Sequence, residues 1–209
     1  MIINLLYVIS SRPGIMQDVG LGSRLQVNSN EMHLNVVKLI FKYLQGTHEY
    51  GLWYPKSKHF NLITFTNSDF VGSIHDKKST SRGAHFLGDC LVSLERKKKS
   101  CISLSTTEAQ YIATTTCCTQ ILCMKKTLRD MHVEYEEPLR IMVDNTSAII
   151  ISKYTVLHSN TKHIPIKYDF LREQVVNKVV KLEYITSNEK IVDIFTKPLP
   201  REQFEYLRE

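Results

Sequence analysis

Acidic and amide side chains from separate parts of the chain have the types and spacing of a metal-dependent phosphoryl-transfer site. Asn67 and Asp69 follow a predicted strand, Glu108 begins a predicted helix, Asp144 follows another strand, and Asp193 lies in a last helix. Mg²⁺ prefers oxygen ligands and keeps water molecules for a substrate, so carboxylates delivered by several elements to one sheet edge suit a two-metal site. The residues therefore indicate a candidate phosphoryl-transfer site.

Each of these side chains also has a purely structural interpretation. Ser105-Thr106-Thr107-Glu108 matches a capping box, in which Glu108 only closes the first helical turn. Asp144 and Asn145 are typical of a helix entry, and an aspartate such as Asp193 in a helix is commonly solvated. The residue pattern alone leaves both interpretations open.

The predicted elements that would position these side chains form a sheet with helices. β-branched and aromatic residues predict a strand at Leu62–Thr66, followed by short strands in antiparallel hairpins and then by strands separated by helices. Antiparallel strands followed by helix-separated strands predict a mixed sheet flanked by helices, an α/β fold. The other predicted strands are 84–87, 91–94, 101–104, 139–143 and 180–185, and the predicted helices are 105–131, 145–151, 165–178 and 188–196.

The first part of the chain is predicted to be mostly helical. Apolar residues recur every three or four positions between Glu31 and Leu44, which is typical of a helix with one buried stripe. Asn28 to Asn30 are candidate caps for its start, and Gly46 is a candidate terminator. A second domain is expected to begin near Phe60.

Composition and charge exclude several classes of protein. The 209 residues are 43% hydrophobic and 23% charged, which is typical of globular chains and not of disordered, collagen-like or coiled-coil ones. A net charge of +6 favours a polyanionic partner such as nucleic acid. With no apolar run long enough to span a membrane, no signal peptide and an odd count of five cysteines, we expect an intracellular protein of the cytoplasm or nucleus with reduced thiols.

Several long motifs, in order and in spacing, identify a family resemblance. They closely resemble the ribonuclease H domain of copia-type LTR retrotransposon Pol polyproteins, and residues 9–54 resemble the end of that family's reverse transcriptase. The motifs are KSTSRGAHFLGDCLVSLERKKKSCISLSTTEAQYIA at 78–113, VDNTSAI at 143–149, TKHIPIKYDFLRE at 161–173 and VDIFTKPL at 192–199. The resemblance implies a C-terminal Pol fragment: a helical, thumb- or connection-like transcriptase tail at 1–57, a ribonuclease H-like domain at 58–200 and a tail at 201–209.

The resemblance also implies an activity and a site. Such domains hydrolyse the RNA strand of RNA–DNA hybrids with two divalent ions, Mg²⁺ or Mn²⁺, held by four acids. Carried onto this chain, the four catalytic and metal-binding positions are Asn67, Glu108, Asp144 and Asp193. The first is a departure, because the stretch that the family usually writes Ser-Asp-Ala-Asp-Trp-Ala-Gly is here TNSDFVG, with Asn67 in place of the aspartate.

Asn67 predicts impaired catalysis. An amide offers one neutral carbonyl oxygen where a carboxylate offers two charged oxygens able to bridge two ions, so metal binding is expected to be weak or absent. The alternative is a rescue by Asp69, which lies on the same side of an extended strand and about 7 Å further on.

Basic residues are the candidate contacts to a nucleic-acid backbone, with a solvated charge run as the structural alternative. The implied partners are an RNA–DNA hybrid or another nucleic acid and the remainder of a Pol polyprotein, with no membrane and no small-molecule cofactor. A different hypothesis is a non-catalytic nucleic-acid-binding or interaction protein derived from a retroelement fragment. The candidate contacts are Lys78, Arg82, Arg96, Lys97, Lys98, Lys99, Lys162 and Lys167.

Overall fold

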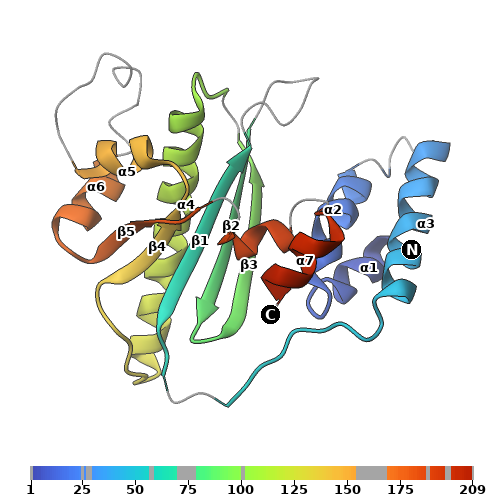
Figure 1. Cartoon of the computed structure of the whole chain (residues 1–209), viewed down its shortest axis with the longest axis horizontal. Coiled ribbons are helices and arrows are strands. Elements are labelled where there is room, and N and C mark those ends of the chain that lie inside the picture. Colours follow the sequence, from blue (N-terminus) through green and yellow to red (C-terminus); the bar gives the residue numbers. More distant parts are fainter. Residues whose placement is uncertain are drawn as a thin grey trace. The chain divides into compact units, whose positions relative to one another are not determined.

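The chain divides into two compact units. The larger unit is Pro55–Val192, and the smaller one joins Met1–Tyr54 to Asp193–Glu209. The sequence-based division at residues 57 and 200 differs from this one mainly by assigning residues 193–200 to the larger domain. The structure, a computed structural model (Figure 1), describes residues 2–24, 26, 30–56, 59–69, 79–99, 102–153, 169–186, 189–195 and 199–208.

A five-stranded mixed sheet forms the centre of the larger unit (Figure 1). Its order is β3-β2-β1-β4-β5, with β2 antiparallel to both β3 and β1, and with β1, β4 and β5 parallel. This arrangement confirms the predicted α/β class. The strands are β1 (Leu62–Asp69), β2 (Thr80–Leu87), β3 (Cys90–Lys98), β4 (Leu139–Val143) and β5 (Val180–Tyr184).

The β2–β3 hairpin is longer than its hydrophobic pattern predicted. Gly88, at the first position of the two-residue turn, has a φ of 59°, which glycine adopts without strain. β3 then continues through Arg96, Lys97 and Lys98, because backbone pairing with β2 extends beyond the apolar residues. The predicted strand at 101–104 is wrong over its described residues 102–104, which lead irregularly into the next helix.

The helices of the larger unit are α4 (Thr106–Asp130), α5 (Thr146–Lys153) and α6 (Asp169–Val176). α4 packs against β1, β2 and β4, and its apolar side interlocks with the sheet in one core. Ser105 caps α4, and Asn145 caps α5 by accepting a 2.9 Å hydrogen bond from the Ala148 N–H, as predicted. Core members include Leu62, Leu139, Ile141, Val143, Val180 and Leu182 from the sheet and Tyr111, Cys118, Ile121 and Leu128 from α4.

The smaller unit is helical. Its core consists of Leu5, Ile15, Val19, Val37 and Ile40. Asn30 caps α3 in a reciprocal pair with His33, and the rings of Tyr50 and Phe204 lie 6.1 Å apart. Its elements are α1 (Ile2–Val8), η1 (Pro13–Ile15), α2 (Met16–Arg24), α3 (Glu31–Gly46) and α7 (Arg201–Arg208); η6 (Ile191–Phe195), a 3₁₀-helix where an α-helix was predicted, spans the unit boundary.

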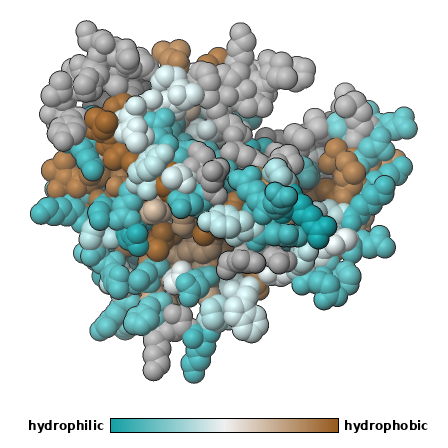
Figure 2. All heavy atoms as spheres, viewed as in Figure 1, coloured by the Kyte–Doolittle hydropathy of each residue, from teal (hydrophilic) through white to brown (hydrophobic). Residues whose placement is uncertain are grey.

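The surface and the helices of the described residues are those of a globular chain. Hydrophilic side chains predominate on the face shown in Figure 2, and the apolar patches between them are small. None of the described helices combines the length and the apolar composition that crossing a membrane requires.

Alkaline pH is expected to destabilise the larger unit. Burial raises the pKa of the Cys117 and Cys118 thiols from 9.0 to about 12, so above pH 9 the unfolded chain loses protons that the folded chain retains. The free energy of unfolding should then fall by up to about 1.4 kcal/mol per pH unit for each thiol. Urea unfolding at pH 8 and pH 10 measures this loss.

Two variants separate the buried thiols from general alkaline effects. Cys118→Ala removes one titrating core group and should make the loss between pH 8 and pH 10 smaller. Cys123→Ala, at an exposed position of the same helix, should leave the loss unchanged. Equal losses in all three proteins would contradict the assignment to buried thiols.

Candidate active site

Asn67 lies two residues before the end of β1, and Asp144 directly follows the end of the neighbouring parallel strand β4. β1 and β4 pair in a register that matches Phe65 with Met142. Continuing this register by two residues puts Asn67 level with Asp144, on strands about 4.8 Å apart. Asn67 is buried and Asp144 is half-buried. The structure therefore brings these two predicted site residues to the same end of the sheet.

Glu108 is held at this end by the start of α4. The Gln110 side chain donates a 3.4 Å hydrogen bond to the Thr66 carbonyl, which fixes the first turn of the helix against β1. The Glu108 carboxylate accepts a 2.6 Å hydrogen bond from the Leu104 N–H, and its backbone N–H donates to Ser105 Oγ at 3.1 Å. The carboxylate of Glu108 thus bonds to the residue before the N-cap and not to the Ser105 N–H that a capping box requires. Its role as a metal ligand stays a prediction.

Lys99 ties β1 to α4 instead of facing solvent. It is buried, and its ammonium donates to the Ala109 carbonyl and, at 3.4 Å, to Ser68 Oγ. Lys99 is a candidate contact to a nucleic-acid backbone in the sequence, but the chain beyond β3 runs directly into the junction between the sheet and the helix, where the ammonium makes these internal contacts. Its ammonium satisfies a carbonyl of the first turn of α4.

Arg82 stands beside Asn67 on the sheet. Directly opposite residues of antiparallel strands share a face, and the register matches Asn67 with Arg82 and Arg82 with Arg96. Arg82 is buried within β2, and its contact with phosphate stays a prediction. Of the other predicted contacts, Arg96 is half-buried, Lys97 and Lys98 are exposed, and Lys78, Lys162 and Lys167 lie outside the described residues.

Lys190 is a functional candidate that the sequence did not reveal. Its side chain is almost fully buried, and its ammonium forms an ion pair with the Asp144 carboxylate, which is 24% exposed. No motif in the sequence indicated that this lysine is buried, since lysine side chains are usually exposed to solvent. A cation therefore already neutralises one of the predicted metal ligands.

Asp69 and Asp193 are the remaining candidates for the site. β1 runs in unbroken register as far as Asp69 opposite Thr80, so its backbone makes no slip that would move Asp69 into the place of Asn67. Asp193 is buried in η6 and belongs to the smaller unit. Its membership in the site stays a prediction.

The described donor set lacks a bridging carboxylate for two divalent ions. The Asp144 carboxylate already forms an ion pair with Lys190, and the Glu108 carboxylate accepts a hydrogen bond from a backbone N–H. Asn67 adds a neutral amide where a bridging carboxylate is needed. A divalent ion at Asp144 would therefore have to compete with the Lys190 ammonium.

Comparison with known proteins finds relatives that match almost the whole chain. It is 34% identical over 202 residues to the retrovirus-related Pol polyprotein from transposon TNT 1-94 of Nicotiana tabacum, and 31% identical over 204 residues to that from transposon RE1 of Arabidopsis thaliana. Both alignments cover 97% of this chain. The chain belongs to the transposon Pol polyproteins. This finding confirms the family indicated by the motifs.

The Pol relatives are much longer than this chain, which spans 15% and 14% of their lengths. A secreted RxLR effector protein of Plasmopara viticola is also similar, at 29% identity over 51% of this chain and 75% of the effector. No protein-family model matches the chain.

Among solved structures, the N-terminal RNase H domain of a Mycobacterium tuberculosis protein fused to maltose-binding protein aligns with a TM-score of 0.46 at 6% identity. The alignment covers 71% of this chain and 96% of that one. Pro55–Val192 is thus an α/β domain with a five-stranded mixed sheet in a chain related to the transposon Pol polyproteins.

Proposed function

We propose that the Pro55–Val192 unit binds RNA–DNA hybrids and descends from a two-metal hydrolase whose RNA cleavage is now impaired. The observation that supports the proposal is the ion pair of Lys190 with Asp144, which the strand register puts level with the amide of Asn67. Binding to phosphates needs only positive charge and shape, so it survives the loss of a metal ligand.

The residues of the chain divide between the two parts of this function. Glu108, Asp144 and Asp193 are the proposed remaining metal ligands, and Asn67 occupies the position of the fourth. Divalent ions, when bound to a complete set, activate the attacking water and stabilise the leaving oxygen. Lys97 and Lys98, exposed on β3, are the proposed phosphate contacts.

Salt-dependent binding to a labelled RNA–DNA hybrid tests the proposal. Replacing Lys97 and Lys98 together with glutamine should weaken the affinity and reduce the slope of log K against log salt by about 0.9 for each lost phosphate contact. The matched control replaces Lys178 and Lys181, which are exposed at or next to β5 on the opposite edge of the sheet. Fluorescence anisotropy measures both pairs.

The outcomes separate binding from catalysis. Equal losses of affinity in the two lysine pairs would contradict a β3 contact surface. Metal-dependent RNA cleavage by the unchanged protein, lost in Asp144→Asn, would contradict impaired hydrolysis.

A second candidate is a non-catalytic nucleic-acid-binding or interaction protein. The ion pair of Lys190 with Asp144 favours it, because this carboxylate is neutralised without a metal ion. Such a protein would bind its partner equally well with asparagine or aspartate at position 67. Measurable affinity for an RNA–DNA hybrid distinguishes nucleic-acid binding from a role in protein interaction.

A further inference from the structure

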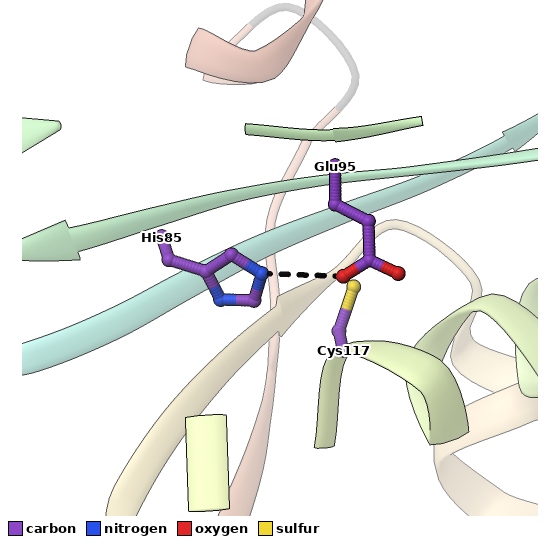
Figure 3. Close-up of side chains that lie close together, drawn as sticks. All are labelled: His85, Glu95 and Cys117. Atoms are coloured by element: carbon purple, nitrogen blue, oxygen red, sulfur yellow. Dashed lines mark ion pairs between the residues drawn. The ribbon is translucent and has the colours of Figure 1, made fainter. Parts of the chain in front are cut away.

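Three side chains that are separate in sequence converge between the sheet and α4. His85 comes from β2, Glu95 from β3 and Cys117 from α4, and their nitrogen, oxygen and sulfur atoms all lie within 4.8 Å of one another. Figure 3 shows the imidazole and the thiol both directed at the Glu95 carboxylate, with His85 Nε2 3.6 Å from Glu95 Oε2. These are three different metal-ligand types in one place.

Gly83 provides the space for this convergence. It lies opposite Glu95 in the β2–β3 register, next to His85 on the same face of β2. A Cβ atom built on Gly83 would stand 2.7 Å from Cys117 Sγ and 3.4 Å from His85 Nε2. Any larger residue would therefore fill the point where the three side chains meet.

His85 is oriented by a polar partner behind it. Thr64 Oγ1 lies 2.8 Å from Nδ1 of the fully buried ring. If Nδ1–H donates this hydrogen bond, Nε2 carries the lone pair and directs it towards Glu95 and Cys117. Nε2 has no hydrogen-bond partner among the described residues. Metal-bound histidines are commonly held in this way, with the second ring nitrogen donating to an oxygen.

The charges of the cluster match one divalent ion. Neutral imidazole, the Glu95 carboxylate and a Cys117 thiolate together carry two negative charges. Binding exchanges the thiol proton for the metal: the S–H bond breaks, the proton leaves to solvent and the metal–sulfur bond forms. The product is electrically neutral, which lowers the cost of burying it.

We propose that His85, Glu95 and Cys117 bind one transition-metal ion of the zinc type. Imidazole and thiolate favour Zn²⁺ over Mg²⁺, and three protein ligands leave a fourth tetrahedral position for water. The Glu95 side chain is 21% exposed, so the site has a route to solvent. This site is separate from the one at Asn67 and does not rest on the proposed function.

Cobalt substitution tests the site in the purified full-length chain. Titration with Co²⁺ should give one bound ion per chain, a sulfur-to-cobalt charge-transfer band and the visible bands of tetrahedral cobalt, all lost when Zn²⁺ is added. Cys117→Ala should remove the charge-transfer band. Cys118→Ala is the matched control, because this adjacent buried thiol belongs to the apolar core and should leave the band intact.

A second variant keeps the test decisive if Cys117→Ala fails to fold. Glu95→Gln changes a partly exposed side chain and should weaken Co²⁺ binding at least about tenfold while circular dichroism stays unchanged. Absence of stoichiometric binding to the unchanged protein would overturn the proposal and leave the His85–Glu95 contact as an ion pair only. Loss of the band in Cys118→Ala, or its persistence in folded Cys117→Ala, would also overturn it.

Discussion

Asn67→Asp is expected to raise the rate of Mg²⁺- or Mn²⁺-dependent RNA cleavage in an RNA–DNA hybrid by about 10²-fold or more. The substitution changes one amide into a carboxylate of the same size at a buried position level with Asp144. It supplies the bridging oxygens that the described site lacks. One well-placed electrostatic group is worth about 2.7–4 kcal/mol in an active site, and each 1.4 kcal/mol is a factor of ten in rate.

Two controls make the expected gain specific. The double variant Asn67→Asp with Asp144→Asn should return to the background rate, because the neighbouring carboxylate is removed. Asn61→Asp adds the same charge just before the other end of β1 and should leave cleavage at background. No gain in a folded Asn67→Asp protein that still binds the hybrid would show that the amide is not what limits hydrolysis.

The sequence correctly predicted the helices and strands that are defined by residues close together in the chain. α3, α4 and β4 lie within two residues of their predicted bounds, because capping residues and a regular apolar period define them. The ends of β3 and the absence of a strand at 102–104 depend on which backbone groups pair across the hairpin. The residues of one strand do not determine which backbone groups of another strand they pair with.

The candidate site was predictable as a set of positions, but its charge state was not. Glu108 and Asp144 were placed by their motifs. The burial of Lys190 beside Asp144 and of Arg82 opposite Asn67 depends on tertiary structure, and the ion pair of Lys190 neutralises a predicted metal ligand. The residues next to these basic side chains in the sequence do not indicate that they are buried.

The His85–Glu95–Cys117 cluster shows why a third group of residues escaped prediction. The two-residue turn pairs Leu87 with Cys90, and counting back in strict register would put Glu95 opposite Arg82. A bulge between His85 and Phe86 shifts the pairing by one residue and puts Glu95 opposite Gly83, on the face of His85. Since a one-residue shift changes the face of every side chain beyond it, the cluster exists only because of the bulge.

Lys190→Gln, made in the Asn67→Asp background, is expected to lower the metal concentration that gives half-maximal cleavage by about tenfold. The Lys190 ammonium forms an ion pair with Asp144, so a divalent ion must compete with it for the same carboxylate. Two unit charges 4 Å apart interact by about 4 kcal/mol at an effective dielectric constant of 20, and relief of about 1.4 kcal/mol of this is already a tenfold change. Glutamine is only one atom shorter than lysine, fits the buried position and removes the charge.

The expected signature is a shift in metal dependence and not in the maximal rate, because Lys190 acts on the occupancy of the site. Lys181→Gln is the matched control, because it removes the same charge from the ion pair between Lys181 and Glu183 on β5. Neither residue belongs to the predicted site. This variant should therefore leave the metal dependence unchanged. Initial rates measured across a Mg²⁺ titration separate the two quantities. A higher metal requirement in Lys190→Gln would reverse the interpretation, since it would mean that the ammonium holds the Asp144 carboxylate in the position that binds the ion.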